Sequence, residues 1–338
     1  MFENLRTVWW DEEGVFIVDQ NRLPVEFTFK VCTDVDEVIE AIKDMTIRGA
    51  PAIGAAAAMG LALAAKHCKA SSMEEFKERL KEVAKAIENT RPTAYNLTWA
   101  LRRVLRVMDR AQSLDEARRL VVEEAIKIAD EDVEVNKAIG RVGVALLRDG
   151  CTVLTHCNAG SLATVGYGTA LAPIREALRR GIKVKVIATE TRPKLQGARI
   201  TSFELKLDGV PVKVITDNMV AYVMQKGAVD LVLVGADRVL RDGHVVNKIG
   251  TLAIAIIAKH FNVPLYVAAP TSTFDLDTDV DNVVIEERDW REVAYIGGCR
   301  LLPRGVEVLN PAFDITPPDL ITGFITEKGV LKPPFNNL

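Results

Sequence analysis

The spacing of apolar residues divides this chain into two halves with different patterns, which meet near Asp149 and Gly150. In the first half, apolar residues recur every three or four positions, which is the period of an amphipathic helix. This period predicts helices at residues 35–45, 51–66, 73–89, 97–108 and 114–147. Ahead of them, residues 14–19 have the character of an edge strand. We therefore predict a mainly helical N-terminal domain, residues 1–149, that contains a short β segment.

The second half contains short apolar runs separated by helical stretches. These runs are rich in Val and Ile and predict strands at residues 152–154, 184–188, 212–215, 231–234 and 264–269. Strands of a parallel sheet that is covered on both faces have this composition. We therefore predict that residues 150–338 form a Rossmann-like α/β domain, and the length of 338 residues agrees with two domains.

Polar residues follow each of these predicted strands. They lie at residues 157–158, 189–192, 216–218, 235–238 and 271–273. Because ligands of open parallel sheets bind at the carboxyl ends of the strands, these segments are predicted to meet in one crevice.

The overall composition favours a small-molecule ligand. Apolar residues make up 49% of the chain and the formal net charge is −3, so the charge gives no reason to expect nucleic acid or an anionic membrane as a partner. The five cysteines form no C-x-x-C pair, which argues against a zinc site or a disulfide framework and favours a reducing, cytoplasmic location. The apolar segment 50–65 is shorter than the roughly 20 residues of a membrane span, so it predicts a buried helix.

Cys157 is the first candidate for chemistry, because it ends an apolar run and opens a glycine-rich turn. The amides of such a turn, together with the start of the helix predicted at residues 170–178, would attract phosphate and lower the pKa of the thiol. A thiolate could then act as a base or a nucleophile. Free cysteines are also often buried for purely structural reasons, so that role stays open. His156 points away from Cys157 on an extended strand, and no Cys–His pair is predicted.

Asp237 is the candidate acid, because it follows four apolar residues and a Gly-Ala step. Loss of water around a carboxyl raises its pKa and lets it donate a proton near neutral pH. Asp237 could instead pair with Arg238 or cap the next turn. Asp217 is a weaker acid candidate, and an N-cap role for a helix that starts at Met219 is favoured for it.

Several groups near these turns could bind an anion. Arg48 precedes Gly49 and a proline-initiated helix, so its guanidinium, the neighbouring amides and the helix N-terminus could together hold one phosphate. Arg91 lies at the end of another predicted helix, Lys248 could neutralise an oxyanion, and Gln196 could bind hydroxyl groups. Each of these side chains could equally be an ordinary surface group.

Six segments of the chain, in the same order, resemble the methylthioribose-1-phosphate isomerase family, and the resemblance covers nearly the whole chain. The segments are residues 48–54, 155–169, 190–199, 235–238, 247–251 and 310–314. This family also includes ribose-1,5-bisphosphate isomerases and the regulatory subunits of translation initiation factor 2B.

The resemblance implies an aldose–ketose isomerisation of methionine salvage, in which 5-methylthioribose 1-phosphate becomes 5-methylthioribulose 1-phosphate. It implies no metal, no cofactor and typically a homodimer. Cys157 and Asp237 would be the catalytic pair, with Asp237 as the acid and Cys157 as a base, a relay or a stabiliser of a hydride shift. The substrate-binding residues would be Arg48, Gly49, Ala50, Arg91, Gln196, Asn247 and Lys248. Two alternatives stay open: isomerisation of 5-deoxyribose 1-phosphate or ribose 1,5-bisphosphate, and a non-catalytic regulatory subunit.

Overall fold

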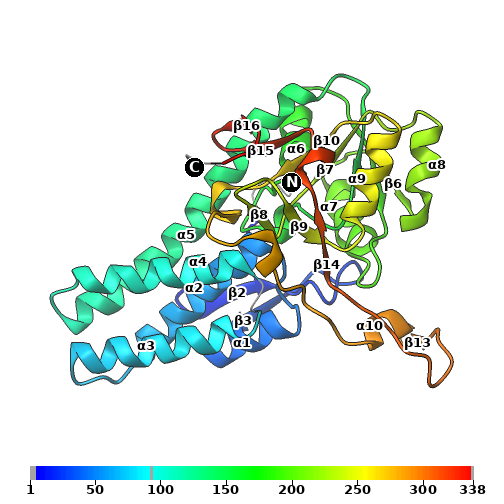
Figure 1. Ribbon diagram of the computed structural model, residues 1–338. Coiled ribbons are helices and arrows are strands. Elements are labelled where there is room, and N and C mark those ends of the chain that lie inside the picture. Colours follow the sequence, from blue (N-terminus) through cyan, green and yellow to red (C-terminus); the bar gives the residue numbers. More distant parts are fainter. Residues whose placement is uncertain (1–4, 92–93, 336–338) are drawn as a thin grey trace.

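The computed structural model describes residues 5–91 and 94–335, and it begins with a small sheet followed by a group of helices (Figure 1). The strands β1 (Val8–Asp11), β2 (Gly14–Val18) and β3 (Phe29–Cys32) form an antiparallel sheet. The helices are α1 (Val35–Lys43), α2 (Ala50–His67), α3 (Met73–Glu88), α4 (Tyr95–Val107) and α5 (Leu114–Gly143). The mainly helical character predicted for this half is therefore confirmed.

The strand predicted as an edge strand is a central one. β2 pairs with β1 on one side and with β3 on the other. Its residues Val15, Ile17 and Val18 are fully buried, as expected for a strand between two neighbours. The prediction was wrong because neither short neighbour, β1 or β3, was recognised in the sequence.

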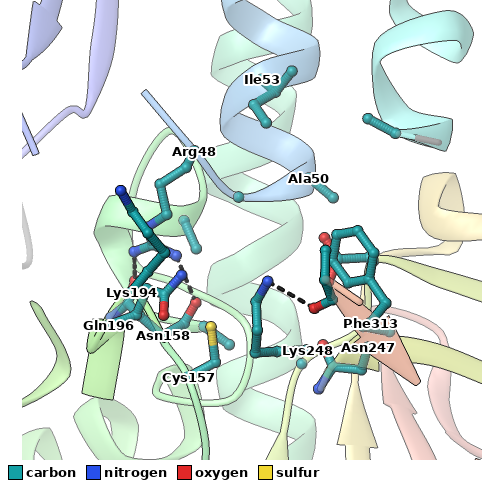
Figure 2. Close-up of a pocket in the computed structure, with 18 of the residues that line it drawn as sticks. Arg48, Ala50, Ile53, Cys157, Asn158, Lys194, Gln196, Asn247, Lys248 and Phe313 are labelled. Atoms are coloured by element: carbon teal, nitrogen blue, oxygen red, sulfur yellow. Dashed lines mark hydrogen bonds between the residues drawn. The ribbon is translucent and has the colours of Figure 1, made fainter. Parts of the chain in front are cut away.

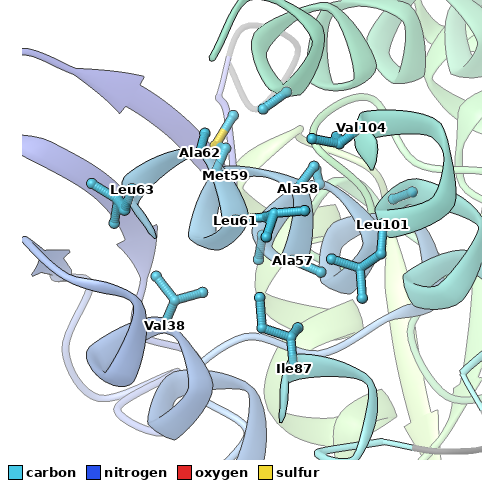
Figure 3. Close-up of a cluster of buried hydrophobic side chains, with 14 of the residues drawn as sticks. Val38, Ala57, Ala58, Met59, Leu61, Ala62, Leu63, Ile87, Leu101 and Val104 are labelled. Atoms are coloured by element: carbon cyan, nitrogen blue, oxygen red, sulfur yellow. The ribbon is translucent and has the colours of Figure 1, made fainter. Parts of the chain in front are cut away.

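Helix α2 is the centre of the N-terminal core (Figure 3). It packs against α1, α3, α4 and α5, and its small side chains make this close packing possible. A Cβ atom at Gly54 would lie 2.8 Å from the backbone oxygen of Asn96 in α4. The buried helix predicted for this segment is thus confirmed. Within the described part of the chain, no helix has the length and apolar character needed to cross a membrane.

The second half is built on a seven-stranded sheet. Its strands are β4 (Thr152–Thr155), β5 (Lys185–Thr189), β6 (Val212–Ile215), β7 (Leu231–Val234), β10 (Leu265–Ala268), β15 (Gly323–Thr326) and β16 (Gly329–Leu331). The strand order is β16-β15-β10-β7-β4-β5-β6, and every neighbouring pair is parallel except β15 with β16. All five predicted strands are present, and the Rossmann-like α/β class is confirmed.

Helices cover both faces of this sheet, so its inner strands are largely buried, whereas the edge strands β6 and β16 are partly exposed. α5, α6 (Ala172–Arg179) and α7 (Ser202–Leu207) contribute to the core on one face. α8 (Val220–Gln225) and α9 (Thr251–His260) contribute to the core on the other face. The near-continuous apolar character of the strands follows from this double coverage.

A second, smaller sheet was not predicted. It has the order β11-β8-β9-β14 and contains β8 (Arg238–Leu240), β9 (Val245–Lys248), β11 (Phe274–Asp275) and β14 (Phe313–Thr316). Between β11 and β14, the chain forms a segment with α10 (Arg291–Ala294) and a hairpin of β12 (Tyr295–Ile296) and β13 (Cys299–Arg300), which projects from the rest of the molecule in Figure 1.

Short helical turns connect several of these elements. They are η2 (Met108–Arg110), η3 (Val144–Leu146), η4 (Ser161–Ala163), η5 (Gly197–Thr201), η6 (Asp217–Met219), η7 (Thr271–Thr273), η8 (Val280–Asn282) and η9 (Pro318–Leu320). The division predicted between residues 149 and 150 falls in the turn between η3 and β4, and as a domain boundary it stays a prediction.

Candidate active site

A pocket lies where the N-terminus of α2 meets the carboxyl ends of β4, β5 and β7 (Figure 2). It encloses about 1020 Å³, including its open mouth. It is lined by all nine residues that the family resemblance assigned to the site: Arg48, Gly49, Ala50, Arg91, Cys157, Gln196, Asp237, Asn247 and Lys248. The structure therefore brings together groups that are up to 200 positions apart in the chain (Arg48 to Lys248).

Cys157 lies just beyond the end of β4, in a turn with a φ of +61°. Its amide donates to the hydroxyl of Thr191 at 2.8 Å, and its carbonyl accepts from the hydroxyl of Thr201 at 2.6 Å. Because the extended conformation ends before this residue, the alternation of side chains is broken and His156 also lines the pocket. The partners of its ring are Thr189 and Ile249, and the expectation that His156 forms no pair with Cys157 stays a prediction.

Burial raises the pKa of the Cys157 thiol, and this effect outweighs the opposing influence of the Lys248 and Arg48 cations. The expected lowering of the pKa is therefore wrong in direction. One reason is that no long helix begins after the turn: η4 has three residues and α6 starts only at Ala172.

A second reason is that two amides of the glycine-rich turn are already in use, while the backbone N–H of Asn158 lowers the pKa of the thiol by less than burial raises it. The backbone N–H groups of Ser161 and Leu162 donate to the carboxylate of Glu204 at 2.8 and 3.1 Å. The amide side chain of Asn158 donates to the same carboxylate at 3.0 Å. The turn thus binds an anion, as its sequence suggested, but that anion is a side chain of the protein itself.

Asp237 lies between β7 and β8, is half-buried and is influenced by three cations. Burial raises the pKa of its carboxyl, although Lys248, Arg91 and Arg48 act in the opposite direction. This direction agrees with the prediction of a proton donor. Arg238 pairs instead with Asp275, with Nη1 and Oδ2 3.1 Å apart.

The α2 N-terminus forms one wall of the pocket. Arg48 donates from Nε to Oε1 of Gln20 at 2.9 Å and from Nη1 to the carbonyl of Asn158 at 3.0 Å, and Nη2 donates to the Asn158 side chain. Gly49 has a φ of +97°, and a Cβ there would lie 2.4 Å from the Cα of Ala163. Only glycine lets the backbone at this position approach that of Ala163 so closely. Helix α2 then begins at Ala50, with Pro51 in its first turn.

The opposite wall comes from β9 and β14. Lys248 donates from Nζ to the carbonyl of Ala312 at 2.9 Å and lies 4.5 Å from the ring centre of Phe313. Burial lowers the pKa of this lysine. Asn247 donates to the hydroxyl of Thr251 at 3.0 Å.

Gln196, after β5, presents a buried Oε1 that has no hydrogen-bond partner among the described residues. Figure 2 shows it beside Arg48 and Lys194. A buried polar atom of this kind is costly unless it binds something, so it marks a place where a polar ligand group fits.

His156 has a positioning role that the sequence did not reveal. Its Nδ1 lies 2.6 Å from the hydroxyl of Thr189 and its Nε2 lies 2.9 Å from the carbonyl of Ile249. Burial lowers its pKa, so we assign a neutral ring that accepts at Nδ1 and donates at Nε2. This ring connects the end of β5 to the loop that follows Lys248.

Asn158, which the sequence placed in the crevice, lines the pocket, whereas other polar lining residues were missed. They include Lys194, Arg288, Glu292 and Asn310. Lys194 and Asn310 lie within segments that carry the family resemblance, which was the available signal for them. Arg288 and Glu292 come from the projecting segment, where no strand or glycine turn marks them.

Asp217 does not cap a helix. Its carboxylate accepts from the backbone N–H groups of Thr191 and Arg192 at 2.8 and 2.7 Å. It thereby fixes the turn after β5, which carries the hydroxyl that binds the Cys157 amide. The N-cap prediction was wrong because the carboxylate accepts instead from the two amides that follow β5. Sequence spacing cannot indicate this contact between two strand ends.

The arrangement suits an anionic polar ligand and proton transfer. The cations Arg48, Arg91, Lys194, Lys248 and Arg288 line the pocket, together with the α2 N-terminus. A carboxyl with a raised pKa and a thiol face the same space. Within residues 5–91 and 94–335, no three His, Cys, Asp or Glu side chains lie together as a metal site would require.

Comparison with known proteins gives a consistent result. The sequence profile described as the initiation factor 2 subunit family matches residues 46–333. A curated relative, the putative methylthioribose-1-phosphate isomerase of Methanocaldococcus jannaschii, is 51% identical over 335 residues, which cover 98% of this chain and 97% of the relative.

Two solved structures share the fold over most of their length. The 5-methylthioribose 1-phosphate isomerase of Pyrococcus horikoshii is 47% identical with a TM-score of 0.88, over 98% of this chain and 93% of that one. The translation initiation factor eIF-2B, subunit delta, from A. fulgidus is 48% identical with a TM-score of 0.85, over 98% and 97% of the two chains.

Proposed function

This chain belongs to the initiation factor 2 subunit family and to its methylthioribose-1-phosphate isomerases, and we propose that it converts 5-methylthioribose 1-phosphate into 5-methylthioribulose 1-phosphate. The observation that carries this proposal is the meeting of Cys157 and Asp237 in one cation-lined pocket. A protein that only binds a sugar phosphate has no need of an acid with a raised pKa and a thiol in the same pocket.

The phosphate group is proposed to bind at the α2 N-terminus. No acidic residue occupies the first turn of this helix. Arg48 and Arg91 add positive charge on the same side, and helix N-termini favour anions for the same electrostatic reason. Gln196, Asn247 and Lys248 remain to bind the sugar oxygens.

Asp237 is proposed to open the sugar ring. The anomeric oxygen carries the phosphate, so the ring opens only when the bond between C1 and the ring oxygen breaks and that oxygen gains a proton. The raised pKa of Asp237 keeps its carboxyl protonated at higher pH than an exposed aspartate and makes it the donor. The carboxylate left behind is a base for the proton that the C2 hydroxyl loses when it becomes the ketone.

Cys157 is proposed to assist the transfer of hydrogen from C2 to C1. A thiolate could remove a proton from C2, or the hydrogen could move directly as a hydride while the thiol stabilises the transition state. The raised pKa of Cys157 favours the second route, because the thiol then stays protonated near neutral pH.

The test is turnover of substrates that differ only at C5. With purified protein, we expect the highest kcat/KM for 5-methylthioribose 1-phosphate, a lower value for 5-deoxyribose 1-phosphate and the lowest for ribose 1,5-bisphosphate. A preference for the bisphosphate would favour the alternative isomerase function. Binding of all three without turnover would favour a non-catalytic regulatory subunit; the A. fulgidus relative is described as the delta subunit of a translation initiation factor.

A homodimer and a cytoplasmic location belong to this proposal as well. Exposed apolar side chains on η6, α8 and α9, namely Met219, Tyr222 and Ile256, offer a surface for a second copy. Light scattering after gel filtration should give twice the mass of 37.1 kDa.

A further inference from the structure

Four charged side chains form a continuous chain along one side of the pocket. Nε of Arg91 lies 3.4 Å from Oε2 of Glu286, whose Oε1 accepts from Nη1 of Arg288 at 3.1 Å. Arg288 in turn makes two hydrogen bonds, of 2.9 and 2.7 Å, to the carboxylate of Glu292. The series of charges connects the segment before α10 to a residue that follows α3.

The link between Arg91 and Glu286 differs from the others in the series. The side chains are 11% and 24% exposed, so water screens their charges only weakly. Nε and Nη1 of Arg91 and Oε2 of Glu286 are nevertheless buried without a hydrogen-bond partner in the described part of the chain. The carboxylate therefore holds the guanidinium by charge and proximity, and leaves those two N–H-bearing nitrogens available to another acceptor.

Glu286 also separates two cations. Arg91 and Arg288 both line the pocket, and without the carboxylate between them they would repel each other. An arginine side chain has many rotamers, and binding is weaker when they must be ordered at the moment of binding. Glu286 orders the Arg91 side chain before the ligand binds and makes no hydrogen bond to its Nε or Nη1, so it removes part of this ordering cost.

We propose that Glu286, anchored by Arg288, is a positioning residue that holds the guanidinium of Arg91 in place to receive the phosphate group of the substrate. Glu286 itself does not line the pocket, so it acts through Arg91. The inference rests on the proposed function, because it takes the phosphorylated sugar as the ligand of Arg91.

A double-mutant cycle with Glu286→Gln and Arg91→Ala tests this proposal. Affinity is measured by calorimetry with inorganic phosphate and, through KM, with 5-methylthioribose 1-phosphate. We expect Glu286→Gln to weaken both by about tenfold with kcat changed by less than about twofold. In the Arg91→Ala background, Glu286→Gln should have no further effect. Equal losses in both backgrounds, or wild-type affinity in Glu286→Gln, would overturn the proposal.

Further variants separate positioning from folding. Glu307→Gln removes an exposed carboxylate from the same segment and should behave as wild type. Glu286→Asp keeps the charge one methylene further away and should fall between wild type and Glu286→Gln, with an unchanged Tm. A fall of Tm that accounts for the lost affinity in both Glu286 variants would count against positioning. Because phosphate affinity needs no turnover, a wild type that binds phosphate without isomerising the sugar contradicts the proposed function alone.

Discussion

Arg175 and Glu204 form an ion pair beneath the turn that carries Cys157, with Nη2 and Oε2 2.7 Å apart and both side chains at most 4% exposed. The same carboxylate receives the Ser161 and Leu162 amides. One buried glutamate therefore fixes the conformation of the turn after β4, and a Cβ at Gly160 would lie 2.2 Å from its Oε2.

Removal of Glu204 should destabilise the fold. Glu204→Ala leaves the Arg175 guanidinium with Asp208 as its remaining carboxylate partner, 2.8 Å away, and frees the turn amides. Breaking a buried pair from one side costs about 3–5 kcal/mol. Urea unfolding should show this loss, whereas Glu26→Gln, in an exposed pair with Arg22, should cost less than about 1 kcal/mol. Similar losses in both variants would contradict the role given to Glu204.

The catalytic assignment predicts a clear kinetic result. Cys157→Ser and Asp237→Asn should each lower kcat by a factor of about 100 or more, because each removes a group that acts in the transition state. Phosphate affinity should survive, since neither side chain is assigned to the phosphate. Cys299→Ser, at an exposed position on β13, is the matched thiol control and should retain full activity. Near-normal turnover in either site variant would remove that residue from the mechanism.

The pH dependence follows from the raised pKa of Asp237. A proton donor works only while protonated, so kcat/KM should fall as the pH rises through this pKa, above the range of an exposed aspartate. The Arg91 and Lys248 cations lower the pKa of Asp237 and the Glu286 carboxylate raises it. Arg91→Ala should therefore move the alkaline limb to higher pH, and Glu286→Gln should move it to lower pH.

These opposite shifts test whether the alkaline limb of the pH profile reports the pKa of Asp237 and whether nearby charges set that pKa. The pH–rate profiles of both variants are compared with that of the wild type at the same ionic strength. Shifts in the same direction would show that the limb does not report the carboxyl of Asp237. Arg48 also faces this group and stays unchanged in both variants.

Sequence patterns predicted the parallel strands and the convergence of their ends well, because both follow from local composition. Apolar runs such as residues 231–234 are buried on both faces, and their period is visible without any partner. The strands β8, β9 and β14 were missed because each is short and gains its stability from its neighbours. The β-propensity of such short segments is too weak a signal to identify them from sequence alone.

The sequence predicted many of the residues that line the pocket and the direction of the Asp237 pKa, but not the direction of the Cys157 pKa. Family resemblance named Arg48 and Lys248, and both line the pocket. The direction of the Cys157 pKa was missed because it depends on burial, and because Glu204, far along the chain, accepts from the Ser161 and Leu162 amides of the turn. Long-range partners of this kind decide whether an amide is free to bind a ligand, and local sequence carries no signal for them.

Gly49 offers a test of how closely the backbone must approach the pocket. Gly49→Ala combines a φ of +97° with a contact of 2.4 Å between the new Cβ and Ala163. Gly150→Ala has the same backbone strain at a φ of +81°, but its Cβ meets nothing within 4 Å. The control should lose about 1–2 kcal/mol of stability, the usual cost of a left-handed residue with a Cβ. Gly49→Ala should lose more and should also weaken phosphate binding, because the clash shifts Arg48 and the first amides of α2. Urea unfolding and phosphate calorimetry measure the two effects, and unchanged phosphate affinity in Gly49→Ala would show that the phosphate binds elsewhere.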